Sequence, residues 1–237
     1  MSGTSGPVPG NVTVMEQWAG AGSGADATAG AAAGGPPSAL VEPPLAPGRV
    51  AALAVGDEAA AGVRLEVPGV VGLLVIRADP ERVPLAAALD EVLGLPLPER
   101  LASGAAGARR LRWISPDEWW LSCPPEELAD VERRLRAALG DAPGAALTNV
   151  TGGWCVLVLG GPAARGVLER STSLDVDPRA FPPGRVASTV FAKTNATLAN
   201  LGDGRYEVIC RRSFADYVAR WIATAARSEG FALGETR

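Results

Sequence analysis

Apolar residues recur with two different periods from about residue 61 onward. Alternating or continuous apolar runs predict strands, and apolar residues three and four apart predict helices. Strands are therefore expected at residues 63–67, 69–78, 111–114, 118–123, 146–150, 154–160, 185–193, 196–202 and 205–212. Helices are expected at residues 79–94, 124–140, 162–170 and 213–230, and a loop rich in Pro, Gly and Ala at residues 96–108.

Turn and capping residues mark the limits of several elements. Asp79-Pro80 is expected to be the N-cap and first position of one helix. Ser213, followed by Asp216, predicts an acidic capping box at the start of the last helix. Two hairpins are predicted by their turn residues, Ser115-Pro116-Asp117 and Gly202-Asp203-Gly204.

The order of these elements repeats. Residues 61–140 are predicted as ββαββα and residues 145–230 as ββαβββα, so two similar halves each end in a helix. This order predicts an α+β fold built by duplication, with mixed or antiparallel sheets. Residues 49–237 are expected to form this single domain.

The first 48 residues differ from the rest in composition. Gly, Ala, Ser and Pro dominate them, and such a segment buries too little apolar area to offset its ordering entropy. A disordered tail is therefore predicted for residues 1–48. Val14, Met15 and Trp18 are the only apolar cluster in it, and both a solvated tail and a docking segment stay open for them.

Composition excludes several classes of function. The formal net charge of −4 indicates no polyanionic partner such as nucleic acid. The longest apolar runs fall short of the roughly 20 residues of a spanning helix. No basic segment followed by an apolar one begins the chain, so a cytoplasmic protein is expected. The cysteines, Cys123, Cys155 and Cys210, are expected to be buried free thiols.

The chain contains no histidine, which limits its chemistry most sharply. A Ser-His-Asp triad, a Cys-His pair and a histidine-ligated zinc are all excluded. Lys193 is the only lysine, and Gly160-Gly161-Pro162 fits a strand-to-helix turn rather than a phosphate-binding loop. We therefore expect no catalytic residue, cofactor site or metal site in this chain.

Three motifs occur in a fixed order: WISPDEWWLSC at residues 113–123, LDVDPRAFPPGR at residues 174–185 and RRSFADYVARWI at residues 211–222. Together they resemble the gamma subunit of heterotetrameric sarcosine oxidase, over roughly residues 50–230. The resemblance implies a fold similar to the folate-binding domain of the glycine-cleavage aminomethyltransferase. It also implies a noncatalytic, structural role in a flavin-dependent complex that oxidatively demethylates sarcosine to glycine.

In that family the gamma subunit packs most directly against the large alpha subunit, with beta and delta subunits completing the complex. FAD, FMN, NAD, zinc and tetrahydrofolate are implied for those other subunits. Two alternatives remain open. One is a stand-alone folate-binding or aminomethyl-transferring protein of the same fold, and the other is the equivalent subunit of an oxidase for a different N-methyl amine.

Five residues are candidates for a partner interface: Trp119, Trp120, Asp177, Arg179 and Phe181. Adjacent strand positions send the two indoles to opposite faces, one into the core and one under a helix or toward a partner. Pro178, Pro182 and Pro183 stiffen the second group, so an Arg and an aromatic residue of the kind enriched in interface hot spots would dock at little entropic cost. A purely structural crossover between the halves is the alternative for this loop.

Overall fold

The computed structural model describes residues 43–45, 53, 60–140 and 144–234. All of these belong to one compact unit that begins at Val41. The tail predicted at residues 1–48 lies outside the described residues, apart from residues 43–45.

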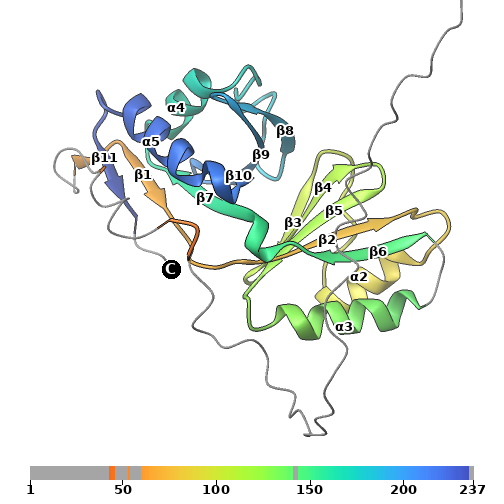
Figure 1. Ribbon diagram of the computed structural model, residues 1–237. Coiled ribbons are helices and arrows are strands. Elements are labelled where there is room, and N and C mark those ends of the chain that lie inside the picture. The colour runs from red at the N-terminus through yellow and green to blue at the C-terminus, as the bar shows by residue number, and fades with distance from the viewer. Residues whose placement is uncertain (1–42, 46–52, 54–59, 141–143, 235–237) are drawn as a thin grey trace, which may run out of the picture. The chain divides into compact units, whose positions relative to one another are not determined.

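The strands form two sheets, shown in Figure 1. The six-stranded sheet has the order β11-β1-β7-β10-β9-β8 and consists of β1 (Val63–Glu66), β7 (Trp154–Gly160), β8 (Val186–Phe191), β9 (Thr194–Gly202), β10 (Arg205–Arg211) and β11 (Phe231–Leu233). The five-stranded sheet has the order β3-β4-β5-β2-β6 and consists of β2 (Gly72–Ala78), β3 (Ser103–Ala106), β4 (Arg109–Ser115), β5 (Glu118–Cys123) and β6 (Ala145–Asn149). Neighbouring strands are antiparallel except β1 and β11, which are parallel.

Two amphipathic helices cover one face of each sheet (Figure 1). Helices α2 (Leu85–Leu93) and α3 (Leu128–Leu139) bury their apolar sides in a core with the five-stranded sheet. Helices α4 (Ala164–Ser171) and α5 (Ala215–Ala225) do the same on the six-stranded sheet. The predicted α+β class is confirmed. No helix in the described part of the chain is long and apolar enough to cross a membrane.

The two halves, however, do not form one sheet each. Strand β1 belongs to the first half but pairs with β7 and β11, and β6 belongs to the second half but pairs with β2. Residues 61–140 and 145–230, predicted as two similar halves, are therefore interleaved, because each half gives its first strand to the sheet of the other. An alternating apolar pattern is satisfied in either sheet, so it does not tell which partner a strand takes.

Several element limits also differ from the prediction. Helix α2 begins at Leu85, because Asp79 instead closes a turn in which its Oδ1 accepts the Glu81 N–H at 3.0 Å. Helix α5 begins at Ala215 after the 3₁₀ turn η4 (Arg212–Phe214), and no side-chain hydrogen bond from Ser213 caps it. The expected loop at residues 96–108 contains strand β3, and β11 follows the last helix. Both predicted hairpins are confirmed.

The sheet faces without helices meet each other. Leu73 and Trp120 of the five-stranded sheet share an apolar cluster with Val156 and Ile209 of the six-stranded sheet. We call these two faces the inter-sheet faces.

Candidate functional site

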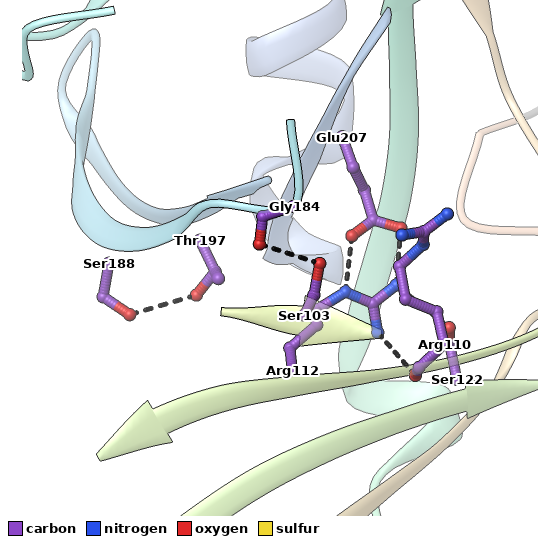
Figure 2. Close-up of polar contacts among 8 residues, drawn as sticks. All are labelled: Ser103, Arg110, Arg112, Ser122, Gly184, Ser188, Thr197 and Glu207. Carbon is purple, nitrogen blue, oxygen red and sulfur yellow. Dashed lines mark hydrogen bonds and ion pairs between the residues drawn. The ribbon is translucent and has the colours of Figure 1, made fainter. Parts of the chain in front are cut away.

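A buried ion pair joins the two inter-sheet faces. The Arg112 guanidinium of β4 donates to both carboxylate oxygens of Glu207 on β10, with Nε and Nη2 each 2.6 Å from an oxygen (Figure 2). Their side chains are 1% and 6% exposed. Nη2 of Arg112 also donates to Ser122 Oγ at 3.0 Å, and Nη1 donates to the Arg110 carbonyl at 3.2 Å. The pair therefore connects the two sheets through charge-assisted hydrogen bonds, which are shorter and stronger than those between neutral groups.

A second arginine lies beside this pair. Burial lowers the pKa of the Arg110 guanidinium, the nearby Glu207 carboxylate opposes that shift, and the positive charges of Arg112 and Arg205 add to it. Figure 2 shows the Arg110 side chain next to the Glu207 carboxylate. A single carboxylate thus faces more than one cation, and the cluster holds the sheets together rather than presenting a free acid or base.

A short loop adds a backbone connection between the same sheets. The Ser103 N–H and the Ser103 hydroxyl both donate to the Gly184 carbonyl, at 2.8 and 3.3 Å. The Val186 N–H donates to the Leu101 carbonyl at 2.8 Å. Gly184 belongs to the LDVDPRAFPPGR motif, so one role of that motif is to connect the sheets.

Beyond the ion pair, aromatic side chains continue along the inter-sheet faces. The rings of Trp120 and Trp154 meet edge to face with centroids 4.5 Å apart. The Arg211 guanidinium lies over the Trp154 ring at 4.5 Å, in register across β10 and β7. A cation above an indole is stabilised by the ring quadrupole. The three side chains form a stack from the buried cluster to the surface.

This stack forms one wall of an open groove of about 780 Å³. The other walls come from β8, from the start of β9 and from η4. Among the described residues that line it, Arg211 and Lys193 are the charged ones, and none is a carboxylate. Val190 and Phe214, which lie at the groove, are 49% and 43% exposed, and they are the exposed large hydrophobic residues of the described chain.

Trp119 and Trp120 lie on opposite faces of their sheet, as predicted for adjacent positions in a strand. Trp119 is 2% exposed in the core under α2 and α3, and its indole N–H has no hydrogen-bond partner among the described residues. Trp120 is 6% exposed, lies in the inter-sheet cluster and donates to Glu118 Oε1 at 2.7 Å. Of the two, only Trp120 lines the groove.

The candidate residues of the proline-rich loop also differ, because some are exposed and one is buried. Arg179 is 92% exposed, and its Nε donates to Asp177 Oδ1 at 2.8 Å. Hydrogen bonds from the Arg179 side chain and backbone lower the pKa of Asp177 to about 2. Phe181 is 1% exposed in the core of the six-stranded sheet, and its carbonyl accepts from Asn200 Nδ2 at 2.7 Å. Arg179 and Phe181 therefore do not share a surface in this chain.

The cysteines are buried free thiols, as predicted. Burial raises the pKa of Cys123 to about 11. A hydrogen bond with Cys210, its neighbour across β7 and β10, and burial both raise the pKa of Cys155. No group of three His, Cys, Asp or Glu side chains in the described residues is arranged to hold a metal ion.

The sequence reasoning missed the residues that organise the site: Arg112, Glu207, Trp154 and Arg211. One signal was present, because Arg112 and Glu207 each interrupt an otherwise apolar strand run, LRWI and YEVIC. A charged residue flanked by buried positions indicates a paired charge. Which charge pairs with which depends on the sheet arrangement.

Two facing sheets with helices on their outer faces define a class of fold. The aminomethyltransferase T of the glycine cleavage system from Bartonella henselae shares it, with a TM-score of 0.51 and 14% identity over 73% of this chain and 48% of that one. The family model "Sarcosine oxidase, gamma subunit family" matches residues 77–228. The chain belongs to that family.

Named relatives agree with this assignment. The sarcosine oxidase subunit gamma of Corynebacterium sp. (strain P-1) is 34% identical over 141 residues, which are 59% of this chain and 68% of the relative. The subunit of Corynebacterium sp. (strain U-96) is 31% identical over 155 residues, 65% and 73% of the two chains. The heterotetrameric sarcosine oxidase from Corynebacterium sp. U-96, in complex with pyrrole 2-carboxylate, contains a chain with TM-score 0.68 and 27% identity, covering 78% of this chain and 93% of that one.

Proposed function

We propose that this chain is the noncatalytic gamma subunit of a cytoplasmic heterotetrameric sarcosine oxidase, a complex that oxidatively demethylates sarcosine to glycine. The observation that carries the proposal is the similarity to a chain of the heterotetrameric enzyme from Corynebacterium sp. U-96, which extends over 93% of that chain. The same similarity covers 78% of this chain. The proposed role is assembly with the alpha subunit most directly, and with beta and delta.

In this proposal FAD, FMN, NAD, zinc and tetrahydrofolate bind to the other subunits. A structural role for this chain is supported by its charged side chains, because the candidate acids and bases pair with one another. Arg112 and Glu207 are committed to each other, and Asp177 is committed to Arg179. The three cysteine side chains are buried, and the surroundings of Cys123 and Cys155 raise the pKa of these two thiols.

The five candidate interface residues differ in whether a partner could reach them. Asp177 and Arg179 lie where a partner could reach them, and Trp120 lies at the wall of the groove. We propose these three as parts of the partner interface. Trp119 and Phe181 are buried by their own chain, so they would support such an interface from within.

Coexpression tests the proposal. The chain is produced with the alpha, beta and delta subunits from the same genome, purified through a tag on alpha, and assayed for sarcosine-dependent oxygen uptake. We expect all four chains to co-purify, and omission of this chain to reduce the yield of assembled enzyme. Full assembly and full activity without this chain, or a purified gamma chain that itself oxidises sarcosine, would contradict the proposal.

The substrate is tested in the same preparation. Dimethylglycine and other N-methyl amines are compared with sarcosine by kcat/KM. A marked preference for another amine would assign the chain to an equivalent oxidase of different specificity. Direct binding of reduced folate to the isolated chain would instead favour a stand-alone folate-binding protein.

A further inference from the structure

The inter-sheet face of the six-stranded sheet continues past the region that the five-stranded sheet covers. Glu207, Ile209 and Arg211 are alternate residues of β10, so their side chains lie on the same face of the sheet. Glu207 and Ile209 are buried where the five-stranded sheet covers this face, and Arg211 lies beyond that part. Trp154 is opposite Arg211 on β7, and Val190 is opposite Asn195 on the β8 and β9 hairpin. Arg211, Asn195 and Val190 are exposed. The groove is therefore an unpartnered part of a sheet face whose other part is a packed interface.

The groove combines cations with apolar side chains. Arg211 and Lys193 take part in no ion pair with any described residue, and no carboxylate lines the groove. Stacking on Trp154 holds the Arg211 guanidinium in place while its N–H groups have no hydrogen-bond acceptor among the described residues. A positioned guanidinium with uncommitted donors is suited to a carboxylate, which it can bind through two hydrogen bonds.

The apolar side chains beside these cations indicate what the rest of the occupant is like. Val190 and Phe214 are 49% and 43% exposed at the groove. Pockets for small ligands bury most of the ligand surface, whereas these side chains lie at an open margin. Trp and Arg surrounded by partly exposed apolar residues are typical of the centre of a protein interface.

We propose that this groove binds a segment of another subunit of the complex, in which an Asp or Glu side chain lies next to an apolar side chain. The carboxylate is received by Arg211 and Lys193, and the apolar side chain packs against Phe214 and Val190. The proposal rests on the proposed function, since it takes the partner from the same complex. A volume of about 780 Å³ holds a few side chains, so the groove is one contact within a larger interface.

The sole lysine makes a direct test possible. Lys193 is exposed, and it is the only side-chain amine of the chain. A water-soluble carbodiimide joins an amine to a carboxylate in direct contact with it, forming an amide without a spacer. The purified four-subunit complex is treated with this reagent, and the cross-linked peptides are identified by mass spectrometry. We expect Lys193 to be joined to an Asp or Glu of another subunit that has an apolar neighbour in sequence.

Three variants accompany this experiment, two in the groove and one outside it as a control. Lys193→Arg keeps the positive charge and removes the reactive amine, so the cross-link should disappear while the complex still assembles. Arg211→Glu reverses the charge at the groove and should weaken association with the other subunits by at least about tenfold. Arg82→Glu makes the same charge change at a 78% exposed site outside the groove, and it should leave association unchanged. Thermal unfolding of each variant alone checks that folding is intact.

The outcomes separate the two proposals. If the wild-type complex does not assemble, the proposed function fails, and the groove proposal falls with it. If it assembles but Lys193 forms no cross-link, or Arg211→Glu binds as tightly as Arg82→Glu, the groove proposal is overturned and the proposed function stands. A cross-link from Lys193 to Glu16 or another carboxylate of its own chain would overturn it in favour of an internal occupant.

Discussion

Arg112 and Glu207 are 95 residues apart in the chain and form a two-point ion pair between the two sheets. Among the described residues it is the one ion pair in which both side chains are almost completely buried. Its energetic value depends on both members, because a buried charge without its partner is costly. A different docking of the sheets that left either side chain buried alone would carry that cost.

Removing one member should therefore cost more than removing both. We expect Arg112→Met to lower the free energy of unfolding by about 3–5 kcal/mol, since it removes both hydrogen bonds that Arg112 donates to the buried Glu207 carboxylate. The double variant Arg112→Met with Glu207→Leu should recover a large part of that loss. Urea unfolding followed by tryptophan fluorescence measures both.

The exposed pair between Arg220 and Asp216 on α5 provides the control. Their side chains are 55% and 43% exposed, and exposed i,i+4 pairs contribute about 0.5 kcal/mol or less. Arg220→Ala should therefore change the unfolding free energy little. A single Arg112 variant that is as stable as Arg220→Ala would show that the buried pair does not hold the sheets together.

The proline-rich loop should respond differently at its two candidate positions. Phe181→Ala removes a ring that is 1% exposed in the core and should cost about 3–5 kcal/mol of stability. Arg179→Ala changes a 92% exposed side chain and should leave thermal unfolding nearly unchanged. If Arg179 contacts a partner, its replacement weakens co-purification of the complex instead. Equal melting temperatures for the two variants would argue against the core position of Phe181.

Gly161 should tolerate no side chain. Its φ is 103°, and a Cβ there would lie 2.5 Å from the Gly62 carbonyl oxygen, a backbone atom that cannot turn away. We expect Gly161→Ala to lower the melting temperature by several degrees, on the scale of backbone strain of about 1–3 kcal/mol. Gly152→Ala is a matched control, because nothing lies within 4 Å of a Cβ at that site. A stable Gly161→Ala variant would contradict the close approach of β1 and the turn after β7.

Alkaline pH should weaken the fold partly through Cys123. Burial raises the pKa of its thiol from 9.0 to about 11, so the folded protein holds this proton more tightly than the unfolded chain. The stabilising contribution is complete below the unfolded value and is lost as the pH rises through the interval toward the folded value. Urea unfolding at pH 8 and at about pH 10.5 should show a smaller loss in Cys123→Ala than in the wild type.

Thiol reagents give an independent check of the same environment. None of the three cysteines should react in the folded protein at pH 8, because all three side chains are buried and the reagent cannot reach them. All three should react in denaturant. Fast reaction of one thiol in the folded state would contradict its burial.

The sequence by itself determined the type of most elements. Leu128, Val131, Leu135 and Leu139 repeat at helical spacing, and all four are buried in α3. The alternation of side chains in β5 predicts that Trp119 and Trp120 lie on opposite faces of the sheet, and they do. Local periodicity carries this information because it reflects the geometry of the element itself.

The helix starts were harder to predict because capping residues have other uses. Asp79 closes a turn instead of starting α2, and Ser213 lies in the 3₁₀ turn η4 instead of capping α5. A short polar side chain can hydrogen-bond nearby backbone in several local geometries, and its sequence context does not distinguish them.

Only the tertiary structure decided which strand joins which sheet. The exchange of β1 and β6 depends on pairing between residues such as Leu65 and Leu159, which are far apart in the chain. The ion pair of Arg112 with Glu207 and the contact of Trp120 with Trp154 follow from that exchange, as does the groove beside Arg211. Burial and charge pairing across two sheets are properties of their docking, and no local pattern contains them.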